Sequence, residues 1–475
     1  MNRKQLFLTS IFFCCFLLMQ LLWADPLPDL GDPSQVTLPP VMEKKLGKEF
    51  MQQLRASGWV IEDPIDAQYI NALGNRLVTA AQVNNQSFFF FFMDDPVVNS
   101  FAGPGGYIAI NTGLLLATDT ESQLAAVMAH EIAHITQGHL ARKLADKSHL
   151  KYSALAGMLA AVALGHVSGQ AAEGAIAATV AGSQQSMLNF SREYEEEADR
   201  VGMTTLENAG FDPQSMPDFF QHLGHLEQFS LQPLALLSDH PLTTERIADA
   251  ENRAAQYPKH SYNKSSEEYY LIKERLRVQT AEDVHAILDY YQTALYKQAI
   301  QPMPAALKYG YALALQANLE YQKAYDAFSA LAQADPNELL YTLGMADVLV
   351  DENKADQAVT LLQPAYAAYP DNYSLMIQYT YTLMKAGQSK KALSIMDKYH
   401  LENPSFPVPY ALLSDIQAKA GELALAYQTR ATYLVQMGAP KAALAQLNVA
   451  LKLPHNDADT LSRIRAQIAE IQTEQ

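Results

Sequence analysis

Cysteine is almost absent from this chain, whose 475 residues include only Cys14 and Cys15. Both lie within an N-terminal apolar segment that we expect to be removed, so the mature chain would contain no thiol. Such a chain forms no disulfide and offers neither a thiolate metal ligand nor a cysteine nucleophile. Any metal site in the mature chain must therefore be built from His, Asp and Glu.

Positive charge is also scarce, because 34 Lys and Arg residues stand against 51 Asp and Glu residues, for a net charge of −17. Nucleic-acid binding requires basic side chains to meet the phosphates, so this balance argues against a nucleic-acid partner. The acidic excess otherwise indicates little beyond solubility.

Beyond its first 24 residues the chain lacks an apolar run long enough to cross a bilayer. Ala154 to Gly165 is apolar but has only twelve residues before His166, whereas a spanning helix needs about 20. We interpret the Ala- and Gly-rich residues 153–187 as a buried or interfacial helix pair, and peripheral contact with a membrane surface through them is left open.

The first 24 residues resemble a secretory signal. Arg3 and Lys4 precede an apolar stretch from Leu6 to Leu22, and Leu22-Trp23-Ala24 offers a cleavage site before Asp25. A thiol-free mature chain suits an oxidising compartment, because it contains no cysteine to be mispaired there. The length of the apolar stretch leaves an uncleaved membrane anchor as the alternative.

A 34-residue period marks the second half of the chain. It links the alanines Ala324, Ala358 and Ala392, and the prolines Pro336, Pro370 and Pro404. This is the tetratricopeptide period, in which small residues let two helices cross closely and proline ends the second helix. We therefore expect a signal segment at 1–24, one domain at 25–265 and a helical solenoid at 266–475.

The N-terminal domain is expected to be mainly α-helical with a small β-sheet. Phe88 to Phe92 is a run of five aromatic residues, best interpreted as a buried strand. Tyr107 to Asn111 follows a Gly- and Pro-rich turn and predicts a second strand, either internal to the sheet or available for a substrate to add to as a further β-strand. Thr120 and Gln123 form a capping box, which predicts a helix running to about Gly138.

This helix carries the motif His130-Glu131-Ile132-Ala133-His134. Residues i and i+4 share one face of a helix, so both imidazoles can reach one zinc ion. Glu131 points beside that ion and can take a proton from a water molecule that zinc has made more acidic. Two satisfied core histidines are the structural alternative, but a buried helix with two His and a Glu needs partners for them.

The third metal ligand must come from elsewhere in the chain. The longer motif that places Gly and His at fixed later positions is rejected, since those positions hold Gln137 and Leu140, and we expect His139 to be solvated. Glu195 and Asp199 lie four residues apart on a later predicted helix. We predict that Glu195 ligates zinc and that Asp199 holds a zinc-bound His from behind, while Glu196 and Glu197 are solvated.

Taken together, the motif and the downstream Glu195-x-x-x-Asp199 resemble the Ste24/HtpX-type zinc metallopeptidases, which implies a gluzincin-like domain with one Zn²⁺ per chain. The resemblance extends to Gly103-Pro104-Gly105-Gly106-Tyr107 and to His240-Pro241 with Arg246. Many members of that family are membrane-embedded, and this chain lacks their spanning helices. A signal segment, this domain and C-terminal repeats together resemble its periplasmic members that act in outer-membrane barrel assembly.

That resemblance implies a periplasmic zinc metalloendopeptidase acting on misassembled outer-membrane proteins, with the barrel-assembly machinery as the partner of the repeats. A repeat-based chaperone or scaffold, with proteolysis secondary, is the alternative function. The resemblance also implies that His240 caps the zinc and keeps the enzyme latent, while a catalytic role for His240 is the competing hypothesis. Arg246 either neutralises a developing oxyanion or pairs with Asp249 or Asp239.

Overall fold

The computed structural model describes residues 38–83, 86–144, 191–229, 234–258, 261–297, 304–402, 409–454 and 457–473. The expected signal segment, both cysteines and the Ala- and Gly-rich residues 153–187 lie outside these ranges. Among the helices within the ranges, none is both long enough and apolar enough for a membrane span.

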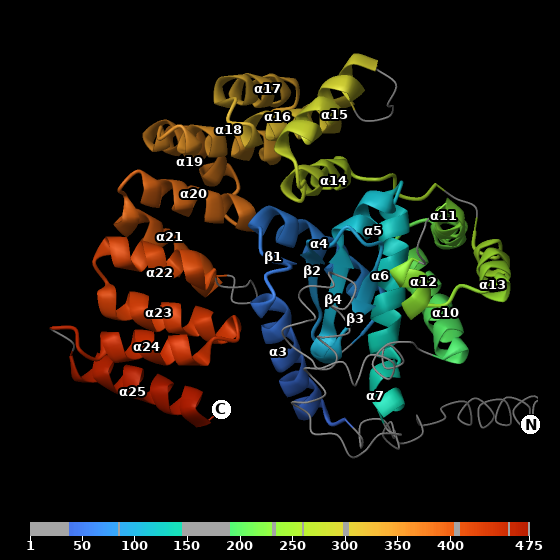
Figure 1. Ribbon diagram of the computed structural model, residues 1–475, viewed down its shortest axis with the longest axis horizontal. Helices are drawn as coiled ribbons and strands as arrows, with labels where there is room; N and C mark the ends of the chain where they lie inside the picture. The colour runs from blue at the N-terminus through green and yellow to red at the C-terminus, as the bar shows by residue number, and fades with distance from the viewer. Residues whose placement is uncertain are drawn as a thin grey trace, which may run out of the picture.

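A four-stranded sheet lies at the centre of the N-terminal half (Figure 1). Its strands are β1 (Val60–Ile61), β2 (Phe89–Met93), β3 (Ser100–Ala102) and β4 (Tyr107–Asn111), in the order β1-β2-β4-β3. β4 pairs with β2 in parallel and with β3 in antiparallel fashion. The hypothesis that β4 accepts a substrate strand is therefore wrong, because both of its edges are paired, and its interpretation as an internal strand is confirmed.

The aromatic run is explained by burial on both faces of β2. Phe90 and Phe92 belong to one hydrophobic cluster, whereas Phe91 and Met93 belong to another. Side chains alternate between the faces of a strand, so a strand with helices on both sides is apolar at every position. Only Phe89 at the start of the strand is largely exposed.

Nine further helices of the N-terminal half are described around this sheet. They are α3 (Pro40–Ala56), α4 (Pro64–Ala80), α5 (Thr112–Ala117), α6 (Glu121–Thr136), α7 (His139–Leu144), α10 (Arg192–Asn208), α11 (Ser215–Phe229), α12 (Ala235–Asp239) and α13 (Thr244–Ala254). The Thr120 hydroxyl accepts a hydrogen bond from Gln123 N at 3.3 Å, so α6 begins where the capping signal predicts. α6 packs between the sheet and α10 and is buried over nearly its whole length.

The second half is a succession of antiparallel helix pairs that runs from right to left along the top of Figure 1 and then down its left side. Its helices are α14 (Glu267–Gln279), α15 (Val284–Lys297), α16 (Pro304–Ala317), α17 (Tyr321–Ala334), α18 (Leu339–Asp351), α19 (Ala355–Ala368), α20 (Tyr373–Lys385), α21 (Ser389–Glu402), α22 (Tyr410–Ala420), α23 (Leu423–Gln436), α24 (Pro440–Ala450) and α25 (Ala458–Thr473). The periodic Ala324, Ala358 and Ala392 are fully buried. Pro336 and Pro370 each follow the end of a helix, so the predicted helical repeats are confirmed.

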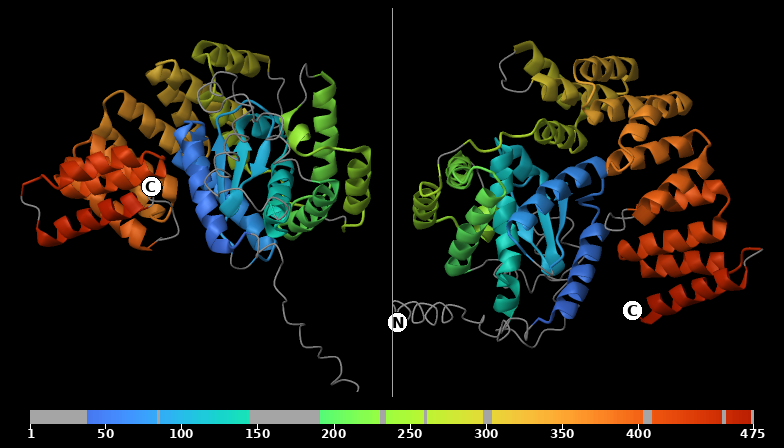
Figure 2. Two further views of the ribbon diagram at one scale, coloured as in Figure 1. Left: turned by 60° about the horizontal axis from the view of Figure 1, so that its bottom comes forward. Right: turned by 180° about the vertical axis from the view of Figure 1, so that it is seen from behind.

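The solenoid curves around the sheet domain rather than extending away from it (Figures 1 and 2). α14 packs against α4 and α5, α20 packs against α4, and α23 approaches α3, where Gln52 Nε2 donates to Val435 O at 2.8 Å. One hydrophobic cluster runs from the sheet domain into the repeats. The division of the chain at residues 265 and 266 stays a prediction.

Candidate metal centre

The two histidines of α6 point the same way and their rings nearly touch. His130 Nε2 lies 2.9 Å from His134 Nε2, and both side chains are buried. This follows from the spacing of four residues, which is close to one helical turn. Glu131 is fully buried beside them.

α10 brings two carboxylates to these rings. Glu195 Oε2 lies 3.4 Å from His130 Nε2, and Glu195 Oε1 lies 3.5 Å from His134 Nε2. Asp199 Oδ1 lies 2.9 Å from His130 Nδ1, on the side of the ring away from the cluster. The structure thus brings Glu195 to both α6 histidines and Asp199 behind His130, while Glu196 faces solvent.

A glycine lets the two helices approach this closely. A Cβ atom at Gly202 would lie 3.0 Å from the backbone nitrogen of His130 and 3.1 Å from its Cα. Gly202 is seven residues, or about two helical turns, beyond Glu195 and therefore on the same face of α10. The crossing of α6 and α10 at Gly202 holds Glu195 against the imidazoles.

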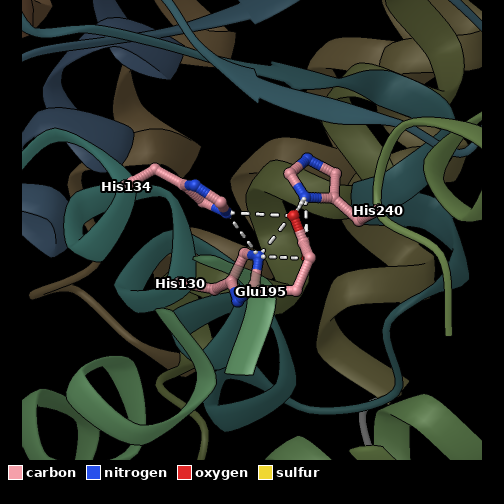
Figure 3. A group of neighbouring side chains, drawn as sticks. All are labelled: His130, His134, Glu195 and His240. Atoms are coloured by element: carbon pink, nitrogen blue, oxygen red, sulfur yellow. Dashed lines mark hydrogen bonds and ion pairs between the residues drawn. The ribbon is translucent and has the colours of Figure 1, made fainter. Parts of the chain in front are cut away.

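The third imidazole comes from His240, the residue that follows α12. Its Nδ1 lies 3.0 Å from Glu195 Oε1 and 3.4 Å from His130 Nε2. Figure 3 shows the four side chains of His130, His134, Glu195 and His240 directed toward a common point. Each offers one ligand atom, and these atoms all lie within 4.8 Å of one another.

The donor set fits a metal cation. Three imidazole nitrogens and one carboxylate converge in a buried space. Nitrogen and oxygen donors without thiolate suit a divalent first-row metal. The carboxylates also make the site favourable for positive charge: burial disfavours protonated His130, yet its bonds to Asp199 and Glu195 outweigh burial and raise the pKa of His130 to about 10.

Burial and neighbouring charges also shift the pKa values of Glu195 and His134. Burial raises the pKa of Glu195, but the neighbouring His240 and His130 outweigh burial and hold that pKa well below its usual range. Burial lowers the pKa of His134, because Glu195 compensates only in part and the other imidazoles oppose a second positive charge. Ligation of a metal requires neutral imidazoles, so a cation bound here would have to displace the proton that the carboxylates stabilise on His130.

Glu131 is oriented by a residue that the sequence analysis missed. The Ser100 hydroxyl, at the start of edge strand β3, donates to Glu131 Oε1 at 2.7 Å. Glu131 Oε2 has no hydrogen-bond partner among the described residues. A strand of three residues carries too little periodic signal to be found from sequence, so only the pairing of β3 with β4 places Ser100 here.

Three expectations about charged or titratable residues are wrong. His139 is fully buried rather than solvated, and Glu197 is partly buried and paired with Arg142 and His139. Arg246 pairs with neither Asp249 nor Asp239: its Nε and Nη2 donate to the two oxygens of Asp199, each at 2.8 Å. These contacts join helices far apart in the sequence, which a local pattern does not predict.

Arg246 makes further contacts through Nη1. Its Nη1 donates to Pro241 O at 2.8 Å and lies 3.0 Å from Glu195 Oε2. Arg246 therefore ties the backbone beside His240 to the two carboxylates of α10. A role for Arg246 at a developing oxyanion stays a prediction.

An apolar pocket opens beside Glu131 and His240, between α6, α11 and α12. Its wall includes Val127, Met216, Phe219, Phe220, Leu223 and Leu237. A pocket of this composition suits an apolar group.

Comparisons with known proteins match both halves of the chain. The model of peptidase family M48 matches residues 64–254, and a tetratricopeptide repeat model matches residues 349–416. The beta-barrel assembly-enhancing protease of Yersinia pestis is 34% identical over 397 residues, covering 84% of this chain and 81% of that protein. The protein of the same name from Escherichia coli (strain K12) is 35% identical over 403 residues, covering 83% and 80%.

Among solved structures, a tetratricopeptide repeat protein from Parabacteroides merdae aligns with 43% of this chain and 86% of its own, at 14% identity and a TM-score of 0.29. The relatives named above match both halves of the chain and share its family of metallopeptidases. The chain is therefore a metallopeptidase of family M48 and belongs to the beta-barrel assembly-enhancing proteases.

Proposed function

We propose that the chain is a zinc endopeptidase in which His130, His134 and Glu195 hold the metal and Glu131 is the general base. The observation that carries this proposal is the convergence of these ligand atoms within 4.8 Å, with Glu131 beside them. A zinc ion at this point would polarise the peptide carbonyl and lower the pKa of water. Zinc is favoured because two imidazoles, one carboxylate and an open position form a common catalytic zinc site.

Other residues of the site position the base, the metal ligands and the substrate. Ser100 holds Glu131 Oε1, so Oε2 is the oxygen available to take a proton from the attacking water and later to pass it to the leaving amine. Asp199 fixes the ring of His130 from behind, and Arg246 fixes Asp199. The apolar pocket beside Glu131 would hold a large side chain next to the scissile bond.

The test of this proposal compares wild type with Glu131→Gln for zinc content and for cleavage of an unfolded protein substrate. The substitution removes the base but none of the ligands, so we expect bound zinc and a loss of activity of about 10²-fold or more. Wild type stripped of metal by a chelator should be inactive, and added zinc should restore it. Substantial cleavage by zinc-loaded Glu131→Gln would contradict the mechanism.

We further infer that His240 restrains this enzyme rather than supplying activity. Its Nδ1 lies within the ligand cluster, 3.0 Å from Glu195 Oε1, and its Nε2 lies 3.6 Å from Glu131 Oε1. An imidazole there occupies the position that water must take. The segment that carries His240 is held at the start of β3, because Leu236 N donates to Val98 O at 3.1 Å and Asn99 Nδ2 donates to Asp239 Oδ2 at 3.0 Å.

We infer a periplasmic location and misassembled outer-membrane proteins as substrates, with the barrel-assembly machinery bound by the repeats. The signal-like N-terminus and the name of the relatives support this, together with a solenoid that offers a protein-binding surface. The second candidate is a chaperone or scaffold in which proteolysis is secondary. Complementation by Glu131→Gln in a strain lacking the protein separates them: full rescue favours the scaffold, and loss of rescue favours the protease.

A further inference from the structure

His139 lies outside the ligand cluster but reaches it through the ring of His134. His134 Nδ1 and His139 Nδ1 are 2.9 Å apart, and His139 Nε2 lies 3.2 Å from Glu197 Oε2. Arg142 Nη1 in turn donates to Glu197 Oε2 at 2.9 Å. These four side chains form one continuous chain from the metal centre to the surface of α7.

We propose that His139 is a positioning residue for His134, which fixes the tautomer and the orientation of that metal ligand. The inference rests on the proposed function, because it requires His134 to ligate a metal through Nε2. A histidine ligand usually donates its other ring N–H to a fixed acceptor, and this partner raises the basicity of the ligating nitrogen. For His130 the partner is Asp199; for His134 it is an imidazole.

The proton positions in this chain follow from its geometry. His134 Nε2 faces His130 and Glu195, so a metal there leaves the proton of the neutral ring on Nδ1. His134 Nδ1 therefore donates to His139 Nδ1, and His139 carries its own proton on Nε2, where it faces the carboxylate of Glu197. Each contact then has one donor and one acceptor. The opposite arrangement would place a proton on His134 Nε2, directed at the cation.

The backbone is shaped to bring His139 to this place. On a continuous helix a residue five positions after His134 would be rotated from it by about 140° and would not meet its ring. α6 instead ends at Thr136, Gly138 adopts a φ of 64°, and α7 begins at His139. A left-handed residue between two helices favours glycine because a Cβ atom is strained there.

The ring of His139 is also held on its face. Tyr194 stacks on it with ring centroids 4.6 Å apart and an interplanar angle of 12°, and the Arg142 guanidinium lies 4.3 Å from the Tyr194 centroid. Tyr194 and Glu197 both belong to α10, the helix that supplies Glu195 and Asp199. One helix thus supports both α6 histidines, His130 directly through Asp199 and His134 through His139.

The inference predicts that His139→Leu, which fills the site without accepting a hydrogen bond, weakens metal binding. Removal of such a partner costs about 10–100-fold in metal affinity. His139→Asn keeps an oxygen near the position of Nδ1 and should restore most of the affinity. His225→Leu, at an exposed histidine of α11, is the matched control and should behave as wild type.

Two measurements test this in the full chain: the rate of zinc transfer to a chromophoric chelator, and the visible spectrum of the cobalt-substituted protein. Faster transfer and an altered spectrum in His139→Leu, with recovery in His139→Asn, support the inference. Wild-type behaviour of His139→Leu in both measurements overturns it while leaving the proposed function intact. Absence of zinc from wild type would instead overturn both proposals.

Glu197→Gln provides a second test of the role of His139 if His139→Leu does not fold. Glu197 is partly exposed, with 27% of its side chain accessible, so its substitution leaves the core intact. It weakens the acceptor for His139 Nε2–H, and we expect a smaller acceleration of zinc transfer in the same direction. An unchanged transfer rate in Glu197→Gln would then count against the chain of contacts.

Discussion

Glu195 and Glu196 are neighbours on α10 that differ in environment: Glu195 is 1% exposed among three imidazoles, while Glu196 faces solvent. If Glu195 is the third ligand, Glu195→Gln should lower zinc affinity by about 10-fold or more, whereas Glu196→Gln should leave it unchanged. Metal analysis after dialysis against a weak chelator measures the difference. Equal loss from both variants would mean that the carboxylate ligand has been chosen wrongly.

The direction in which His240→Ala changes the rate of peptide cleavage distinguishes two roles for His240. If it restrains the enzyme, His240→Ala frees the water position and increases peptide cleavage several-fold at equal zinc occupancy. If it stabilises the transition state, the same variant loses activity of about 10²-fold while zinc is retained. A peptidase assay with zinc content measured in the same samples decides between them. A large loss with zinc in place would reject latency.

At the scale of elements, the crossing of α6 and α10 decides whether the ligands meet. A Cβ at Gly202 would press on the buried backbone of α6 at 3.0 Å, whereas a Cβ at Gly224 of α11 has nothing within 4 Å. Gly202→Ala should therefore destabilise the protein by about 1–2 kcal/mol and weaken zinc binding, because α10 must move outward. Gly224→Ala should stabilise the protein by up to about 1 kcal/mol, because alanine favours a helix.

Urea unfolding and zinc titration of both glycine variants measure these effects. The comparison controls for helix propensity, since both glycines lie inside helices and receive the same methyl group. Unchanged zinc affinity in Gly202→Ala would indicate that the helix separation does not determine the position of Glu195.

At the scale of the whole molecule, a charged network joins the sheet domain to the repeats. Arg275 of α14 lies 2.6 Å from Asp63, whose side chain caps α4, and 3.5 Å from the buried Asp66. Arg275 also helps to stabilise ionised Asp347 on α18. Acidic groups from both halves of the chain therefore surround one guanidinium. The packing of the repeats against the sheet domain should then depend on the ionisation of these carboxylates.

Asp347 makes this coupling measurable as a pH dependence. Burial, only partly offset by Arg275, raises the pKa of Asp347 to about 7, compared with about 3.9 in an unfolded chain. The folded protein binds the proton more tightly, so this group's effect on stability becomes unfavourable as pH rises from about 4 to 7. Asp347→Asn should be more stable than wild type by about 1–2 kcal/mol at pH 8, after discounting for partial exposure, and nearly equal to it below pH 4.

Urea unfolding at pH 4, 6 and 8 tests this expectation, with Asp326→Asn as the control because Asp326 is an exposed carboxylate on the neighbouring helix α17. Only the difference between variant and wild type is informative, since many other groups titrate over this range. A constant difference at all three pH values would show that Asp347 does not titrate between its folded and unfolded pKa values.

Short spacing along the chain was enough to predict several features of this protein. The positions of His130 and His134, four residues apart, place both rings on one side of α6, because helical geometry fixes that relation locally. The 34-residue period determined the helical solenoid for the same reason, since each repeat contacts mainly its neighbours. The five aromatic residues before Met93 predicted a buried strand because burial on both faces leaves no polar position.

Contacts between segments that are distant in the chain became apparent only from the packed fold. Ser100 meets Glu131 because β3 pairs with the far side of β4, and this same pairing excludes β4 as a substrate edge. Arg246 meets Asp199 because α13 returns to α10, and His139 is buried because the chain bends at Gly138. Each of these side chains could form its hydrogen bonds with several different partners. Which partner it meets depends on how the helices and strands pack, and local residue patterns do not contain that information.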